Sequence, residues 1–139
     1  AYHFYNPNSE PIRQADFYIS QVKLEKGDLA PVLDIERKPR DKAKLQADLV
    51  KFLNRLEQHY GVKPIIYTSY KYRARYLDAP EFAKYPLWIA HYYVDSLSYE
   101  GPWQFWQHTD YGTVPGIDES VDLNVFSGSL DGLQRYTLK

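Results

Sequence analysis

Residues 30–36 read APVLDIE, a short apolar run that ends in two carboxylates. The run is too short for an ordinary helix, and its composition is typical of a strand that is buried on both faces. Because side chains alternate along a strand, Asp34 and Glu36 project from one face while Leu33 and Ile35 project from the other. Residues at the carboxyl ends of parallel strands commonly face a ligand. The stretch therefore predicts a buried strand that carries two acids to one site.

The segments on either side of this strand alternate between strand-like and helical patterns. Upstream, residues 1–5 read as a strand end, and residues 10–26 carry apolar residues at helical spacing, with Gly27 as the expected stop. Downstream, the clearest helix spans residues 41–60 and is followed by Gly61. An order of strand, helix, strand and helix is typical of βα units that are built around parallel strands.

The rest of the chain continues this pattern and then loses it. A helix is predicted over residues 70–77, and strands are predicted over residues 63–69, 87–92, 103–108 and 121–126. A loop rich in Gly and Pro separates the last two strands, and the final third shows no further helical pattern. The sequence therefore predicts an α/β fold whose regular alternation fails towards the C-terminus.

Length and composition exclude several classes of protein. The chain has 139 residues, of which 44% are hydrophobic and 25% charged, and this predicts one domain with its own core. A net charge of −1 offers no basic footprint for nucleic acid, and no apolar run approaches the ~20 residues of a membrane span. Without cysteine there are no disulfides and no thiolate sites. The 14 tyrosines and 3 tryptophans offer flat, amphipathic faces that suit sugar rings as well as protein partners.

The two acids at the end of the predicted strand suggest catalysis by a pair of carboxyl groups. Asp34 and Glu36 repel each other when both are ionised, which favours one protonated acid beside one carboxylate. Glycoside hydrolysis uses such a pair. The alternative is that the two acids form a surface salt-bridge cluster with Arg37, Lys38 and Arg40. Taken alone, the Asp-x-Glu motif favours this alternative. The apolar run before them favours the functional interpretation.

Other chemistries find less support in the sequence. A metal site is disfavoured because the histidines lack ligand spacing; they stand at positions 3, 59, 91 and 108. No Gly-x-Ser-x-Gly elbow and no glycine-rich phosphate loop is present. We therefore expect neither a metal ion nor a cofactor.

Six motifs occur in a recognisable order: AYHFY, PVLDIE, IIYTS, LWIAHY, FWQH and VPGIDESVDLNVF. This order, which covers essentially the whole chain, resembles family 25 glycoside hydrolases, the N-acetylmuramidase-type lysozymes that cut peptidoglycan. Its most specific parts are DIE and the VPGI…VDLN ending. The resemblance implies a modified (β/α) TIM-like barrel with a sugar groove at the carboxyl ends of its strands. It also implies hydrolysis of the β-1,4 bond between N-acetylmuramic acid and N-acetylglucosamine, and a secreted or cell-envelope location.

The same resemblance implies roles for individual residues. Glu36 is the expected general acid/base, and Asp34 is the expected partner that supports the N-acetyl group or the oxocarbenium-like state. Asp122 matches the family's carboxylate on the last strand. The expected groove residues are His3, Tyr67, Trp88, Tyr92, Trp106 and Gln107. Core packing is the alternative for Trp88 and Trp106, and for Trp103 it is the preferred interpretation.

The chain departs from the family at its start. The family opens with a strand that bears an Asp-x-Ser-type motif and with a second strand, and nothing here corresponds to either. A complete (β/α)₈ barrel typically takes about 250 residues. We therefore expect one glycoside hydrolase domain over residues 1–139 that lacks its N-terminal strands and forms an incomplete barrel. Because one active-site carboxylate is then missing, a module that binds glycan without cutting it is the alternative function. A barrel of another class, in which the two acids are structural, is a third.

Overall fold

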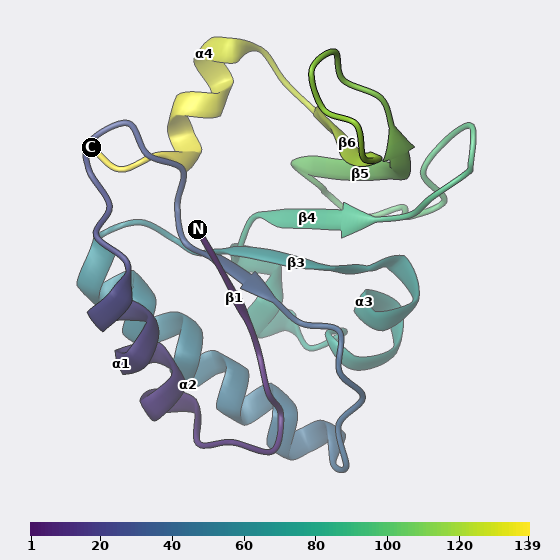
Figure 1. The fold of residues 1–139 in the computed structure, drawn as a ribbon. Coiled ribbons are helices and arrows are strands. Elements are labelled where there is room, and N and C mark those ends of the chain that lie inside the picture. Colours follow the sequence, from purple (N-terminus) through teal and green to yellow (C-terminus); the bar gives the residue numbers. More distant parts are fainter.

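The structure, a computed structural model, describes residues 1–139 and is built on a six-stranded sheet in the order β1-β2-β3-β4-β5-β6. The strands are β1 (Tyr2–Phe4), β2 (Val32–Asp34), β3 (Ile65–Ser69), β4 (Leu87–Ala90), β5 (Phe105–Gly112) and β6 (Val121–Phe126). The first five run parallel, whereas β6 is antiparallel to β5. The sheet does not close, because β1 and β6 remain its two edges (Figure 1). This confirms the predicted α/β class and the incomplete barrel.

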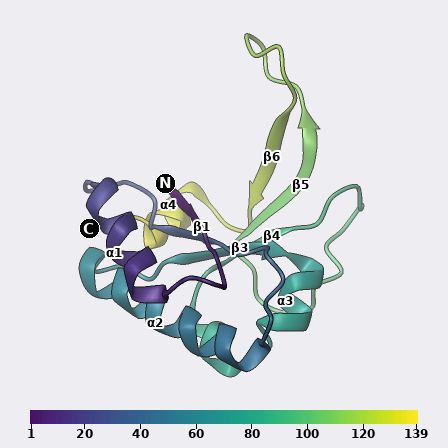
Figure 2. The same ribbon diagram turned by 60° about the horizontal axis from the view of Figure 1, so that its bottom comes forward.

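The helices follow the strands as the sequence predicts, with α1 (Pro11–Gln21), α2 (Lys42–Tyr60) and α3 (Tyr70–Tyr76) as the main ones. α1 and α2 lie side by side below the sheet (Figures 1 and 2). The predicted bounds of α2 are confirmed at both ends. Its N-cap Asp41 accepts a hydrogen bond from the Lys44 N–H, and Gly61 ends it with φ 70, a left-handed value that suits glycine.

The predicted extension of the first helix to Lys26 is wrong. The helix ends at Gln21, and Val22 is already extended, with φ −112 and ψ 114. The Tyr60 hydroxyl donates to the Val22 carbonyl at 2.7 Å, so a contact from α2 holds the chain out of the helix. Gly27, with φ 94, serves a later turn instead of a helix end.

Near the C-terminus the structure also departs from the prediction. The strand expected to begin at residue 103 begins at Phe105 and continues to Gly112, where it forms one arm of a hairpin with β6 (Figure 2). Gly112 is needed there because a Cβ would stand 2.4 Å from the Leu123 side chain. Beyond β6, where no helix is predicted, short helical segments follow; they are α4 (Leu130–Leu133) and the 3₁₀ helix η2 (Gln134–Tyr136), while another 3₁₀ helix, η1 (Pro80–Lys84), precedes β4.

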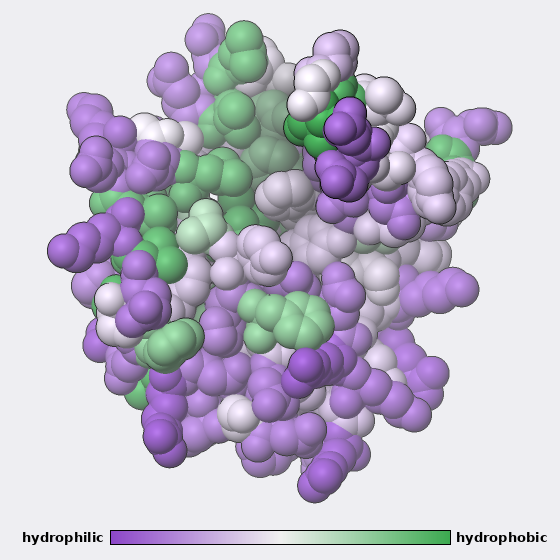
Figure 3. All heavy atoms as spheres, in the orientation of Figure 1, coloured by the Kyte–Doolittle hydropathy of each residue, from purple (hydrophilic) through white to green (hydrophobic).

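The two faces of the sheet are packed differently. On the face towards α1 and α2, Leu33 and Ile35 are fully buried against apolar side chains of α2 such as Phe52, as the alternation predicts. On the opposite face a smaller apolar cluster contains Val32 and Phe105. In the space-filling view apolar side chains gather in the upper half around α4, whereas the region of α1 and α2 below is mainly hydrophilic (Figure 3). None of the helices combines the length and the apolar composition needed to cross a bilayer.

Candidate functional site

The face of the sheet that the helices leave free carries a hollow of about 430 Å³. The residues that line it come from β1 to β6 and from the loops beside them, and they include the three predicted carboxylates. The lining residues that matter here are Asp34, Glu36, Tyr67, Trp88, Gln107, Asp122 and Asn124. The structure therefore brings Asp34 of β2, Glu36 just after β2 and Asp122 of β6 together from distant parts of the sequence, and we call this hollow the groove.

Strand register explains why these side chains meet. Asp34 of β2 lies opposite Tyr67 of β3, and Tyr67 lies opposite Trp88 of β4. Further along the sheet, Gln107 of β5 lies opposite Asn124 of β6. Because paired residues in neighbouring strands point to the same face, Asp34, Tyr67 and Trp88 form one row across the sheet. Gln107 and Asn124 belong to the next row on the same face, since Gln107 lies opposite Ala90, two residues after Trp88.

Asp34, the last residue of β2, and Glu36, two residues further on, differ in their surroundings. Asp34 is half-buried, and its Oδ1 is buried without a hydrogen-bond partner. Burial, and next the nearby charge of Glu36, raise the pKa of Asp34 from 3.8 to about 7. Glu36 lies just beyond the strand end and is exposed at the groove. Asp34 is therefore near the midpoint of its titration at neutral pH, beside a carboxyl group that solvent or ligand can reach.

The amide of Gln107 organises the other side of the groove. Its side chain is only 5% exposed, and its Oε1 accepts hydrogen bonds from the hydroxyls of Tyr67 and Tyr92, both at 2.5 Å. Its Nε2 donates to Oδ2 of Asp122 at 3.0 Å. Two donors on one atom and a carboxylate on the other fix the orientation of the amide. Gln107 therefore positions Asp122 and holds both tyrosine hydroxyls.

Trp88 forms an aromatic wall of the groove. Its indole N–H donates to Oδ1 of Asn124 at 2.8 Å, and its ring meets that of Tyr67 edge-on, with the ring centres 5.8 Å apart. Asn124 is a groove residue that the sequence reasoning missed. Its signal was present, because it stands two positions after Asp122 on the same strand and so shares its face.

Two predicted groove residues lie on the other face of the sheet. His3 stacks on Phe52 of α2, with ring centres 5.2 Å apart, and its Nε2 is hydrogen-bonded to Gln14 Oε1 at 3.1 Å. Trp106 donates its indole N–H to the His91 carbonyl at 2.8 Å and packs against the main core. Both alternate with residues that face the groove, so their predicted groove positions are wrong. Trp103 also packs against the main core, which is the role that we preferred for it from the sequence.

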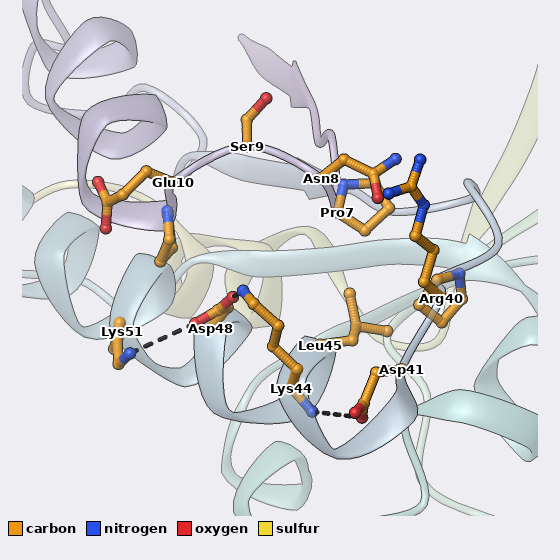
Figure 4. Close-up of a pocket in the computed structure, with 12 residues that line it drawn as sticks. Pro7, Asn8, Ser9, Glu10, Arg40, Asp41, Lys44, Leu45, Asp48 and Lys51 are labelled. Carbon is orange, nitrogen blue, oxygen red and sulfur yellow. Dashed lines mark hydrogen bonds and ion pairs between the residues drawn. The ribbon is translucent and has the colours of Figure 1, made fainter.

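A second and larger cleft, of about 600 Å³, lies between the loop after β1 and the first turns of α2 (Figure 4). Its buried acid is Asp48, which pairs with Lys44 and, at 3.3 Å, with Lys51. Burial alone would raise the pKa of Asp48, but the hydrogen bonds and charges of the two lysines lower it. The cleft contains none of the predicted site residues. Nowhere do three His, Asp or Glu side chains gather closely enough to hold a metal ion.

Comparisons with known proteins agree with this geometry. A family model described as glycosyl hydrolases family 25 matches residues 1–117. The uncharacterized protein YegX of Escherichia coli K12 is 38% identical over 138 residues, which are 98% of this chain and 50% of YegX. Lysozyme M1 of Streptomyces globisporus is 30% identical, over 93% of this chain and 49% of the lysozyme. The chain thus spans about half the length of these relatives.

Solved structures give the same result. A family 25 glycosyl hydrolase from Bacillus anthracis superposes with a TM-score of 0.87 at 33% identity, covering 99% of this chain and 68% of that one. The bacterial lysozyme from Streptomyces coelicolor superposes with a TM-score of 0.86 at 30% identity, covering 99% of this chain and 70% of the lysozyme. The open sheet described above is thus an arrangement that these larger structures contain.

Proposed function

Because the chain belongs to glycosyl hydrolase family 25, we propose that it acts as a lysozyme on bacterial peptidoglycan. The bond that it hydrolyses is the β-1,4 linkage between N-acetylmuramic acid and N-acetylglucosamine. The observation that carries this proposal is the convergence of Asp34, Glu36 and Asp122 in one groove that Tyr67 and Trp88 line as well. The names of two relatives, Lysozyme M1 and the bacterial lysozyme of Streptomyces coelicolor, also support it.

Glu36 is the proposed general acid and base. It is exposed at the groove, where the oxygen of a glycosidic bond can reach it. A glycan bound there excludes water from Glu36, so the proton passes directly between the carboxyl group and the bound sugar. The neutral acid protonates the leaving oxygen, and the resulting carboxylate then takes a proton from the water that completes hydrolysis.

Asp34 is the proposed supporting carboxylate. Asp34 lines the groove, so its carboxyl group can meet a hydrogen-bond donor of the substrate there, while its buried Oδ1 has no partner in the protein. The ionised form of Asp34 can accept a hydrogen bond from the acetamido N–H of the sugar, or stabilise the positive charge of the oxocarbenium-like transition state. Since its pKa is raised to about 7, this form is abundant at and above neutral pH.

Asp122 and the aromatic residues complete the proposed site. Asp122 lines the groove, and the hydrogen bond from the Gln107 amide at 3.0 Å limits the orientation of its carboxylate. Tyr67 and Tyr92 must remain protonated to donate to Gln107, and burial raises the pKa of each, which keeps them protonated. Trp88 offers a half-buried ring on which a sugar can stack. These residues bind and orient the glycan while Glu36 exchanges the proton.

The proposed partner is the glycan strand of peptidoglycan, which lies outside the cytoplasmic membrane of bacteria. We therefore propose that the protein works as a secreted or cell-envelope enzyme. We propose no nucleic-acid or membrane-inserted partner.

A matched pair of variants tests the proposed acid. The full-length protein is expected to clear a suspension of purified peptidoglycan, and Glu36→Gln is expected to slow clearing by about 10²–10⁴-fold. Glu25→Gln removes an exposed carboxyl in the loop after α1 and is expected to leave the rate unchanged. Equal rates for Glu36→Gln and Glu25→Gln would remove Glu36 from the mechanism.

The alternative of a glycan-binding module makes a different prediction in the same assay. The aromatic lining of the groove suits such a module as well as an enzyme. Sedimentation of the protein with peptidoglycan, without any new reducing ends, would favour the module and exclude hydrolysis.

A further inference from the structure

We propose that Tyr93 and Asp110 form a second sugar-binding position beside the groove, which takes an N-acetylglucosamine ring away from the bond that is cleaved. This inference rests on the proposed function, because it extends the path of the same glycan. Tyr93 lies in the loop after β4, and Asp110 lies on the β5 arm of the hairpin that stands out from the body of the protein (Figure 2).

The backbone of Tyr93 is the first observation. It is the only residue other than glycine with a positive φ, at 58. A bulky side chain rarely adopts this left-handed conformation, since it costs conformational free energy. Burial does not offset that cost, because Tyr93 is 69% exposed. Residues held in such conformations cluster at functional sites, and here the conformation presents an aromatic ring to solvent.

The ring of Tyr93 is nevertheless fixed in place. Its N–H donates to the His108 carbonyl at 3.2 Å, and its hydroxyl donates to Oδ1 of Asp110. That hydrogen bond raises the pKa of Tyr93 to about 12, so the hydroxyl stays protonated over the physiological range. The ring is thus tied at both ends to β5, which lowers the entropy that a stacked ligand would have to remove.

The fixed ring lies next to the groove. Its centre is 6.0 Å from that of the Tyr92 ring, and the Tyr92 hydroxyl donates to Gln107 inside the groove. Burial raises the pKa of Tyr92, and the negative charges of Asp122, Asp110 and Glu36 raise it as well. Asp110 is therefore close enough to add its charge to those of the groove.

The charge of Asp110 selects the sugar. Asp110, which is hydrogen-bonded to Tyr93, repels the lactyl carboxylate of N-acetylmuramic acid and the peptide that can extend from it. N-acetylglucosamine is neutral, and its apolar C–H face can stack on the exposed ring of Tyr93. Its hydroxyl and acetamido groups are donors for the oxygen of Asp110 that Tyr93 does not occupy. The position therefore fits the neutral sugar of the alternating glycan.

Binding of N-acetylglucosamine oligomers tests this proposal. The dissociation constants of the dimer and the hexamer are measured by calorimetry for the full-length protein and for Tyr93→Asn. Asparagine tolerates the left-handed conformation, so this variant removes the ring with little change in backbone preference. We expect Tyr93→Asn to weaken hexamer binding about 3–10-fold and to leave dimer binding unchanged.

Two further variants separate stacking from a structural role. Tyr93→Trp keeps an aromatic face and is expected to retain hexamer affinity to within about twofold. Phe17→Ala removes a comparably exposed aromatic ring from α1 and is expected to change neither affinity. Equal weakening of dimer and hexamer by Tyr93→Asn, no weakening of either, or no binding of the hexamer to the unaltered protein would overturn the proposal.

A second measurement needs no variant and therefore tests the proposal even if Tyr93→Asn fails to fold. In the unaltered protein, the NMR signals of the Tyr93 ring should shift on addition of the hexamer and not of the dimer; unshifted signals would overturn the proposal. Peptidoglycan clearing by the same preparation distinguishes the two claims. If the protein clears peptidoglycan but its Tyr93 signals do not distinguish the hexamer from the dimer, the proposed function stands and the second sugar position is wrong. If the Tyr93 signals respond to the hexamer alone but peptidoglycan is not cleared, the second sugar position stands and the proposed function is wrong.

Discussion

Asp34 and Asp48 are both aspartates shielded from solvent, yet their surroundings are opposite. Asp48 is only 6% exposed and is paired with Lys44 and Lys51, so its pKa is lowered. Asp34 is half-buried beside the like charge of Glu36, has an unpartnered Oδ1, and has a pKa raised to about 7. Both acids are shielded, so the direction of the pKa shift depends on whether the carboxylate is paired with a cation and not on burial alone.

The largest expected effect concerns activity. Replacing Asp34 with Asn removes the charge that we propose supports the substrate, so Asp34→Asn should lower the rate of peptidoglycan hydrolysis by about 10²–10³-fold. Asp48→Asn should leave the rate per folded molecule within about twofold, since Asp48 lies in the other cleft. Initial rates normalised to the folded fraction check this. Comparable losses of rate in both variants would contradict the distinction between Asp34 and Asp48.

The next effect concerns stability. Asp48→Asn leaves Lys44 and Lys51 without their partner, and we expect it to destabilise the protein by about 1–3 kcal/mol at pH 7. Because the folded-state pKa of Asp48 is lowered, its contribution is present above the unfolded value of 3.8 and is lost as pH falls through the folded value. Urea unfolding at pH 7 and in strong acid measures this. A destabilisation that stays constant with pH would contradict the paired role.

Asp34→Asn is expected to have the opposite sign. Since folding raises the pKa of Asp34, the ionised carboxyl destabilises the folded protein, fully above about pH 7 and not at all below the unfolded value of 3.8. After allowance for its partial exposure, Asp34→Asn should stabilise the protein by about 1–2 kcal/mol at pH 8. The gain should vanish towards pH 3.5. Thermal unfolding across this range checks the sign, and destabilisation at pH 8 would contradict the account.

The smallest effect concerns the Gln107 network. Tyr67→Phe removes one of the two hydroxyls that donate to Gln107 Oε1, while Tyr92 still satisfies that atom. We expect a loss of stability of about 0.5–1.5 kcal/mol. Tyr2→Phe removes an exposed hydroxyl that makes no hydrogen bond within the protein and serves as the control in the same unfolding assay. Equal effects of the two substitutions would mean that the network adds nothing to stability.

The sequence was sufficient where a local rule decided the outcome. Asp41 and Gly61 set the ends of α2 through capping, and the alternation in β2 placed Asp34 on the face opposite Leu33. The resemblance supplied Asp122, which a single strand pattern could not connect with β2. The convergence of these acids depends on strand order and register, which the βα pattern indicates only in outline.

The sequence was insufficient where tertiary contacts decided. The motif match places His3 and Trp106 in the groove, whereas their contacts with Phe52 and with the His91 carbonyl place both on the other face of the sheet. The early end of α1 depends on a hydrogen bond between Tyr60 and Val22, which no local pattern reveals. Asp110 lies beyond register irregularities in β5, where strict alternation no longer predicts a face.

Mass spectrometry of digested peptidoglycan tests the central claim most directly, because it identifies the sugar at each new reducing end. Convergence of Asp34, Glu36 and Asp122 on the proposed linkage predicts N-acetylmuramic acid at these ends with the unaltered protein, and almost no new ends with Glu36→Gln. New ends that carry N-acetylglucosamine, or an unchanged yield from Glu36→Gln, would contradict it.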